Sequence, residues 1–330
     1  TEVLWDDWST IEAKLDVYDR AGIRNVYGAG MVDRGADAVF QELVTDIQAR
    51  EDDVDHPPLE TFVEETDAVV DEVDSLIETY NGTADGRQSI WPAPVVVETT
   101  TNQCFREAYA LAEKHDVMTT AHVAEAEAQE QRDISSIEYL RNVGYLGERT
   151  LLGHCVQIDA GDVRTLAETG TAVAHNFMAN MRLATGFAPV VEMLDTGVTV
   201  GLGTDNSILS DTVNPLSDVR AMAGGHKGYH HDAGVVDAQT AFDMITRDAA
   251  AAIGRAKSLG SLETGTQADL AIVDLDHPHL TPSNDPVFTL VHAAQGFEVD
   301  TVICAGDVIM EDREIQTFNE PLNDILTRAS

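Results

Sequence analysis

The fold is decided by residues 150–205, which read TLLGHCVQIDAGDVRTLAETGTAVAHNFMANMRLATGFAPVVEMLDTGVTVGLGTD. Three short apolar runs in this stretch end in a polar residue, at His154, His175 and Asp205. Upstream, the run VMTTAH ends in His122 in the same way. A stretch of helical character separates each run from the next. Short apolar runs that alternate with helices are typical of a parallel sheet in an α/β protein.

The same alternation extends toward the N-terminus and predicts six strands, near residues 23, 89, 117, 150, 171 and 198. The intervening helices are expected at 7–21, 36–49, 60–80, 102–115, 137–143, 161–169, 189–195, 214–223 and 237–253. This pattern indicates a (β/α)8 TIM-type barrel, which closes with eight strands. The chain begins with neither Met nor a strand pattern, so we expect residues to precede Thr1 in the natural protein.

From about Leu259 the pattern changes to alternating residues with turn signals, as in GSLETGTQADLAIVDLD and VDTVICAGDVIMEDREI. Such segments predict antiparallel strands joined by hairpins. We therefore expect a barrel domain over residues 1–258 and a small β-sandwich-type domain over residues 259–330. A terminal helix is expected from Pro321.

The composition is strongly acidic, with 58 Asp plus Glu against 20 Lys plus Arg and a formal net charge of −38. Such a charge repels nucleic acid and anionic membranes, so neither is an expected partner. The acidic residues are dispersed and lysine is scarce, which favours a high-salt cytoplasm over an ordinary acidic protein. Three cysteines without a CxxC pattern, and no signal peptide or long apolar run, indicate a reducing, cytoplasmic setting.

The polar residues that end the four runs carry the expected chemistry. In a parallel barrel the carboxyl ends of the strands converge on one face, where active sites lie. Taken singly, His122, His154 and His175 could be buried structural histidines, and Asp205 could cap a helix. Their joint occurrence on successive strands instead favours a site for one divalent metal, Zn²⁺ or Fe²⁺.

Two further polar residues follow these strand ends. Glu125 lies three residues after His122, where a glutamate can take a proton from an attacking water and pass it to a leaving nitrogen. Asn180 follows His175 by five residues, and its amide could hold a polar ring near the rim.

Three stretches, TTAHVAEAEAQ (119–129), residues 151–207 and GSLETGTQADLAIVDLD (260–276), resemble the amidohydrolase superfamily in sequence, order and spacing. The similar branch contains chlorohydrolases and aminohydrolases that act on triazines, cytosine, guanine and adenosine derivatives. By this resemblance His122 is a metal ligand, Glu125 is the proton-shuttling glutamate, and His154 assists the attacking water or the substrate. Asp205 is implied to be both a metal ligand and the general base.

The resemblance also implies that His175 and Asn180 belong to a pocket-lining segment that reads HCPxSN in relatives. Here Asn176 and Phe177 replace the Cys and Pro of that segment. The first-strand HxH, which supplies two metal ligands in the family, is missing from the sequence. The HxH pattern does occur at residues 277–279, but in the predicted β-domain.

The sequence thus predicts a metal-dependent hydrolase that releases ammonia from a nitrogen heterocycle, with a small-molecule heterocyclic substrate. The resemblance further implies a homodimer. Two alternatives stay open. The same side chains could expel chloride from a chlorinated heterocycle. If the chain is complete, it could instead be a metal-free relative that binds a ligand or partner without turnover.

Overall fold

The computed structural model describes residues 2–3, 8–35, 63–130, 133–205 and 213–318. Its strands are β1 (Glu2–Val3), β2 (Asn25–Met31), β3 (Gln88–Pro94), β4 (Thr119–Val123), β5 (Thr150–His154), β6 (Ala172–His175), β7 (Val200–Leu202), β8 (Leu270–Val273), β9 (Val299–Cys304), β10 (Asp307–Glu311) and β11 (Glu314–Ile315).

The α-helices are α1 (Trp8–Arg20), α3 (Thr66–Tyr80), α4 (Thr83–Gly86), α5 (Asn102–His115), α6 (Ser136–Val143), α7 (Ala160–Thr169), α8 (Phe177–Arg182), α9 (Val190–Thr196), α11 (Pro215–His230), α12 (Ala238–Met244), α13 (Arg247–Ala252) and α14 (Pro286–His292). Three short 3₁₀ turns are η2 (Val97–Thr99), η3 (Glu127–Glu130) and η4 (Pro278–Leu280).

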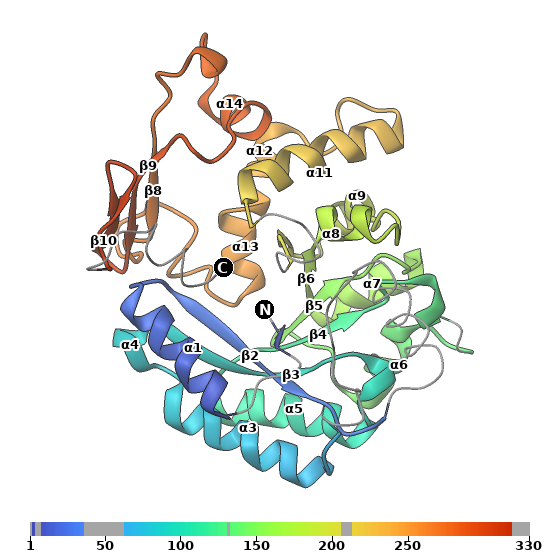
Figure 1. Ribbon diagram of the computed structural model, residues 1–330. Coiled ribbons are helices and arrows are strands. Elements are labelled where there is room, and N and C mark those ends of the chain that lie inside the picture. The colour runs from blue at the N-terminus through green and yellow to red at the C-terminus, as the bar shows by residue number, and fades with distance from the viewer. Residues whose placement is uncertain (1, 4–7, 36–62, 131–132, 206–212, 319–330) are drawn as a thin grey trace, which may run out of the picture.

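The strands β1 to β7 run parallel in chain order, as two sheets that meet along their edge strands β3 and β4 (Figure 1). One sheet has the order β1-β2-β3 and the other β4-β5-β6-β7. A parallel bridge between Val96 and His122 joins them, and the His122 amide donates to the Val95 carbonyl at 3.0 Å. This consecutive parallel order confirms the predicted barrel-type α/β fold, because each strand must return through a helix to run parallel to its neighbour.

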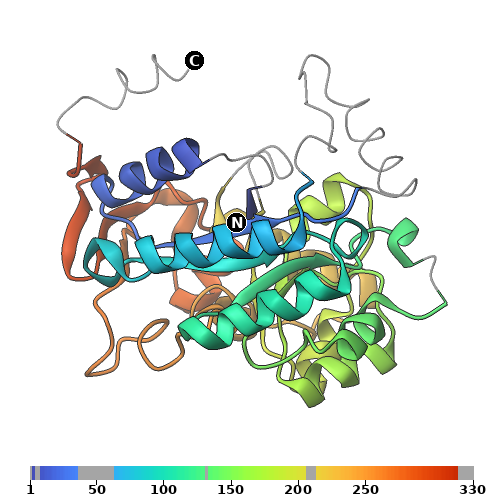
Figure 2. The same ribbon diagram turned by 90° about the horizontal axis from the view of Figure 1, so that it is seen from below.

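The helices α1, α3 and α5 lie side by side along the strands β2 and β3 (Figures 1 and 2). Their apolar faces contribute Leu15, Leu76 and Phe105 to one continuous core with the strands. The predicted strands overlap β2 to β7. The sequence pattern missed β1, because two residues are too few to show a strand period.

The region after α13 forms a separate antiparallel sheet with the order β11-β10-β9-β8, next to α1 and β2 (Figure 1). The Arg24 guanidinium, just before β2, binds both carboxylate oxygens of Asp269 at 2.6 and 2.9 Å and ties the sheet to the barrel. This agrees with the expected small β-domain, while the exact domain boundary after residue 258 stays a prediction.

One long predicted helix, 237–253, is wrong: the structure breaks it into α12 and α13. The break lies at Thr246, whose backbone is not helical (φ −129°, ψ −95°) and whose hydroxyl bonds back to the Phe242 carbonyl at 2.8 Å. The break lets α12 pack on α14 while α13 packs on β7. The predicted helices at 36–49 and from Pro321 lie outside the described residues.

The described residues bear on two further expectations, which concern disulfides and membrane-spanning helices. The three cysteines are all buried and form no disulfide. None of the described helices has the length and apolar composition needed to cross a bilayer.

The helix α11 contains two neighbouring glycines with opposite surroundings. A Cβ at Gly224 would meet nothing within 4 Å, because this residue faces solvent. A Cβ at Gly225 would lie 2.3 Å from Cζ of the buried Phe177 ring, so α11 approaches α8 closely only because residue 225 lacks a side chain.

We expect Gly224→Ala to stabilise the protein by about 0.5–1 kcal/mol, because alanine favours the helix. Gly225→Ala should destabilise it by about 1–3 kcal/mol, because the Phe177 ring must leave its packed position. Thermal or denaturant unfolding of the two variants measures the difference. Equal effects at both positions would contradict the close α8–α11 contact.

A buried carboxylate lies in the first turn of α11. The Asp218 side chain is fully buried, and only one of its oxygens is hydrogen-bonded in the described residues, by the Ser217 hydroxyl at 3.2 Å. Burial raises the pKa of Asp218 from 3.8 to about 6. The folded protein therefore holds a proton on Asp218 at pH values where the unfolded chain has lost it.

Because of this raised pKa, wild-type stability should fall as the pH rises from about 4 through 6. Asp218→Asn keeps the shape and never ionises. We expect its Tm to exceed that of the wild type by a few degrees at pH 7.5, and the gain to vanish near pH 4. Asp195→Asn, at an exposed position, serves as control. A gain that does not depend on pH would contradict this prediction.

Candidate active site

The carboxyl ends of β4, β5 and β6 carry His122, His154 and His175, and Asp205 follows β7 by three residues. The parallel register pairs His122 with Gly153 and Val123 with His154. Adjacent strands therefore deliver these side chains to one end of the sheet, as the sequence predicts.

The imidazole of His154 lies between the two candidate catalytic carboxylates. Its Nδ1 is 3.5 Å from Glu125 Oε1, and its Nε2 is 3.7 Å from Asp205 Oδ2. The His154 side chain is only 1% exposed, whereas Glu125 and Asp205 keep 16% and 10% of theirs exposed. Both carboxylates thus reach solvent or a ligand while one buried imidazole separates them.

The Asn180 side chain orients the His154 ring, and Asn176 lies beside it. The Asn180 amide nitrogen is 3.0 Å from Nδ1 of His154 and also donates to the Thr185 hydroxyl. If Asn180 donates to Nδ1, the ring proton lies on Nε2, the nitrogen that faces Asp205. The Asn176 amide nitrogen lies 3.4 Å from Nε2.

His122 stands beside His154, with ring centroids 5.2 Å apart and the planes tilted by 37°. Its register partner Gly153 lies next to this ring: a Cβ there would be 3.5 Å from His122 Cδ2, an ordinary van der Waals distance. The structure therefore places His122, Glu125 and Asp205 around the imidazole of His154.

The backbone turns sharply at these strand ends. Ala124, His154, Cys155 and Asp205 all have left-handed φ values, between 49° and 70°. A non-glycine residue in this region costs about 1–3 kcal/mol, so surrounding contacts must hold it. The Ala124 carbonyl accepts from the amides of Val156 and Gln157 at 3.0 and 2.8 Å, which links the loops after β4 and β5.

His175 packs against a second histidine, which comes from α11. It is completely buried, and its Nε2 lies 3.3 Å from Nε2 of the equally buried His226 on α11. Burial, reinforced by the neighbouring His226 and His154, lowers the pKa of His175 to about 3, so the ring is neutral near pH 7. Burial likewise lowers the pKa of His226 to about 4. The role of His175 in substrate binding stays a prediction.

Sequence reasoning missed two residues beside Glu125. The Gln129 side-chain carbonyl accepts from the amides of Glu125 and Ala126 at 2.8 and 3.0 Å. Its amide group donates to the buried Glu98 carboxylate at 3.2 Å. No signal in the sequence connects Glu98 with Gln129, because they follow different strands.

The donor types at the strand ends fit a divalent metal, since an imidazole and a carboxylate are ordinary zinc ligands. His122 and Asp205 are only two ligands, and a catalytic zinc normally has three from the protein. Among the described residues the tightest group of ligand atoms is a different one, Asp74, Glu78 and His115 on α3 and α5. Both of its carboxylates already pair with the Lys114 ammonium group.

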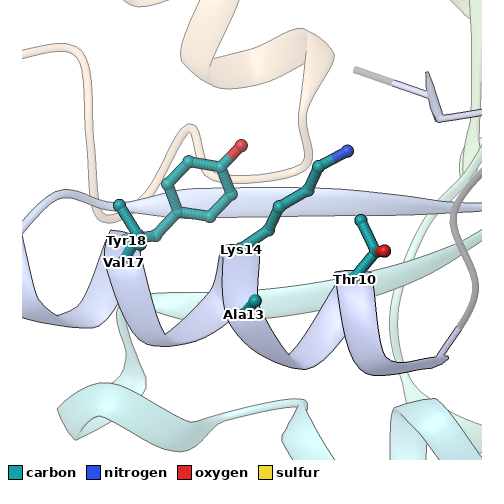
Figure 3. Close-up of a pocket in the computed structure, with 5 residues that line it drawn as sticks. All are labelled: Thr10, Ala13, Lys14, Val17 and Tyr18. Atoms are coloured by element: carbon teal, nitrogen blue, oxygen red, sulfur yellow. The ribbon is translucent and has the colours of Figure 1, made fainter. Parts of the chain in front are cut away.

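A hollow of about 570 Å³ lies elsewhere, along one face of α1 (Figure 3). Its lining residues are Thr10, Ala13, Lys14, Val17 and Tyr18. They all belong to one outer helix and include none of the residues at the strand ends, so we do not assign the site there.

Comparison with known proteins gives an independent test of the family and the fold. The model of the amidohydrolase family matches residues 7–309. An S-triazine hydrolase from Gordonia rubripertincta is 36% identical over 305 residues, which are 91% of this chain and 62% of the relative. A 5-methylthioadenosine/S-adenosylhomocysteine deaminase from Haloarcula marismortui is 35% identical over 325 residues, 97% of this chain and 69% of the relative.

Among solved structures, an atrazine chlorohydrolase from Arthrobacter aurescens in complex with zinc superposes with a TM-score of 0.84 at 26% identity. The superposition covers 97% of this chain and 68% of the chlorohydrolase chain. The chain thus spans 62–69% of the length of these three proteins. The family match extends over most of its residues, and the parallel strands and their polar ends agree with it: the chain belongs to the amidohydrolase family.

Proposed function

We propose that the protein containing this chain is a metal-dependent hydrolase that removes an amino group from a nitrogen heterocycle. The observation that carries the proposal is the placement of His154 between two carboxylates, 3.5 Å from Glu125 and 3.7 Å from Asp205. Such a reaction needs one group that takes a proton from the attacking water and another that gives a proton to the leaving nitrogen, and two carboxyl groups can fill these roles.

Each side chain has a distinct role in this proposal. Asp205 takes one proton from the attacking water. Glu125, protonated at the start, gives its proton to the ring nitrogen, then takes the second proton of the added water and passes it to the departing ammonia. Exchange of the Asp205 proton with solvent, and reprotonation of Glu125 from solvent, reset both carboxyl groups. His154, with its proton on Nε2, donates a hydrogen bond that steadies the attacking oxygen or polarises the substrate.

His122 and Asp205 would hold the metal, together with at least one further ligand. A bound divalent cation would act as a Lewis acid and lower the pKa of water toward about 7. Zinc is favoured because the similar chlorohydrolase structure contains it, whereas Fe²⁺ stays a prediction from the donor types alone.

The small-molecule substrate is expected to contact Asn180. Its side-chain oxygen is buried and has no hydrogen-bond partner among the described residues. A buried carbonyl oxygen in this state is an acceptor for the N–H of an exocyclic amine or ring. We expect such a site to favour a substrate with an amino group over an analogue that lacks the N–H group.

Dechlorination is the second candidate, because the similar solved structure is an atrazine chlorohydrolase. The same arrangement could expel chloride after water attacks the ring carbon. Analysis of the released product therefore decides between ammonia and chloride as the leaving group.

We also infer a high-salt setting for the protein. The net charge of −38 and the similarity to a Haloarcula marismortui protein support this inference. Dispersed acidic residues repel one another, and salt screens that repulsion. The cytoplasmic location and the homodimer remain predictions.

The full-length, zinc-loaded protein should release ammonia from at least one compound in a panel of cytosine, guanine, adenosine derivatives and melamine. With that substrate, Glu125→Gln and Asp205→Asn should each lower kcat/KM by about 10²–10⁴-fold, because each removes a proton carrier. Glu127→Gln, at an exposed position two residues from Glu125, should change it little. Chloride release from chlorotriazines without any ammonia release would favour the second candidate. Release of neither ammonia nor chloride from any of these compounds would favour a non-catalytic relative.

The metal position can be tested without turnover. Measured metal content should fall strongly in His122→Ala and Asp205→Ala, because each substitution removes a proposed ligand. His115→Ala is the matched control, since His115 belongs to the ligand group on α3 and α5. Loss of zinc in the His115 variant, with normal zinc in the His122 variant, would move the metal to the outer helices and overturn the proposal.

A further inference from the structure

We propose that Gln129 and Glu98 are positioning residues that fix the backbone of Glu125 and so set the place of its carboxylate. The inference rests on the proposed proton-carrying role of Glu125. Neither residue is among those that the sequence pattern singles out, and they come from two different loops, after β3 and after β4.

The first step is the contact between Gln129 and the Glu125 segment. One side-chain oxygen of Gln129 accepts from two successive amides, those of Glu125 and Ala126. The backbone N–H of Gln129 donates to the Ala126 carbonyl at 3.0 Å. Side chain and backbone of one residue thus close the turn that begins at Glu125.

The second step is the orientation of the Gln129 side chain. A carboxylate only accepts hydrogen bonds, so Glu98 must receive the NH₂ end of Gln129, at 3.2 Å. The oxygen end is then forced toward the two backbone amides. A reversed side-chain amide would place NH₂ against two N–H donors and face the carboxylate with an oxygen.

The third step is the anchoring of Glu98 itself. It is 1% exposed and lies in η2. The Arg34 guanidinium, just after β2, donates to the carbonyls of Val97 and Glu98 at 2.6 and 3.1 Å. The loops after β2, β3 and β4 therefore form one connected hydrogen-bonded frame behind Glu125.

These hydrogen bonds surround a residue with a strained backbone conformation. Ala124, directly before Glu125, has a left-handed φ of 51°, a conformation that surrounding contacts must hold. Val156 and Gln157 hold the Ala124 carbonyl from the side of β5, and Gln129 holds the two following amides from the other side. The Glu125 carboxylate is then placed by backbone fixed at both ends.

The test exchanges the carboxylate of Glu98 and the side-chain amide of Gln129. Gln129→Glu retains the acceptor for the two amides but sets a carboxylate against Glu98, so the contact should break. The double variant Glu98→Gln/Gln129→Glu restores one donor and one acceptor with their roles reversed. Gln239→Glu is the matched control, because Gln239 donates to Asp243 at 3.0 Å on the exposed face of α12.

Two measurements are made on the zinc-loaded protein. Hydrogen exchange of the Glu125 and Ala126 amides should quicken at least about 10-fold in Gln129→Glu and return toward the wild-type rate in the double variant. With a substrate that the wild type turns over, kcat should fall about 10–100-fold in Gln129→Glu, with KM little changed, and recover in the double variant. The control should alter neither.

Unchanged exchange in Gln129→Glu, or a double variant no better than the single one, would overturn the proposal. Altered exchange with unaltered kcat would overturn the positioning role. If the wild type turns over no substrate but the exchange pattern follows the swap, the contact stands and the proposed function fails. If Gln129→Glu does not fold, recovery of folding in the double variant supports the pairing.

Discussion

The register of the parallel ladder is the constraint on which the site depends. His122 is paired with Gly153 and Val123 with His154, so strand alternation alone would point the two imidazoles to opposite faces of the sheet. The left-handed φ of 70° at His154 ends this alternation, and the two rings stand 5.2 Å apart. A shift by one residue would turn every side chain of a strand to the other face.

The rim of the sheet is held by hydrogen bonds between neighbouring loops rather than by regular secondary structure. The left-handed residues after β4, β5 and β7 aim the functional side chains away from the strand direction. Backbone hydrogen bonds to the Ala124 carbonyl connect the turns after β4 and β5, and Arg34, Glu98 and Gln129 connect the loops after β2, β3 and β4. Strain at functional residues is thus balanced by contacts that involve no candidate catalytic atom.

The electrostatics of the site agree with a bound cation. Two carboxylates, Glu125 and Asp205, lie on either side of one buried imidazole in a protein with a formal charge of −38. Like charges brought together away from bulk water raise the free energy unless a positive charge balances them. A divalent ion at the proposed metal site would supply that balance, whereas the Asp74–Glu78 pair on the outer helices already has Lys114.

The sequence by itself determined the parallel α/β fold and the strand-end residues, because period and spacing are local properties that the chain shows directly. The family followed from the resemblance of three of its stretches to known members. It could not determine the two-residue strand β1, the break at Thr246, the burial of His175 against His226, or the contact of Glu98 with Gln129. Each of these depends on which segments the folded chain brings together. His175 and His226 are 51 residues apart, and Glu98 and Gln129 are 31 apart. Pairing over such separations is fixed by packing and hydrogen bonding in three dimensions, and only the tertiary structure decided it.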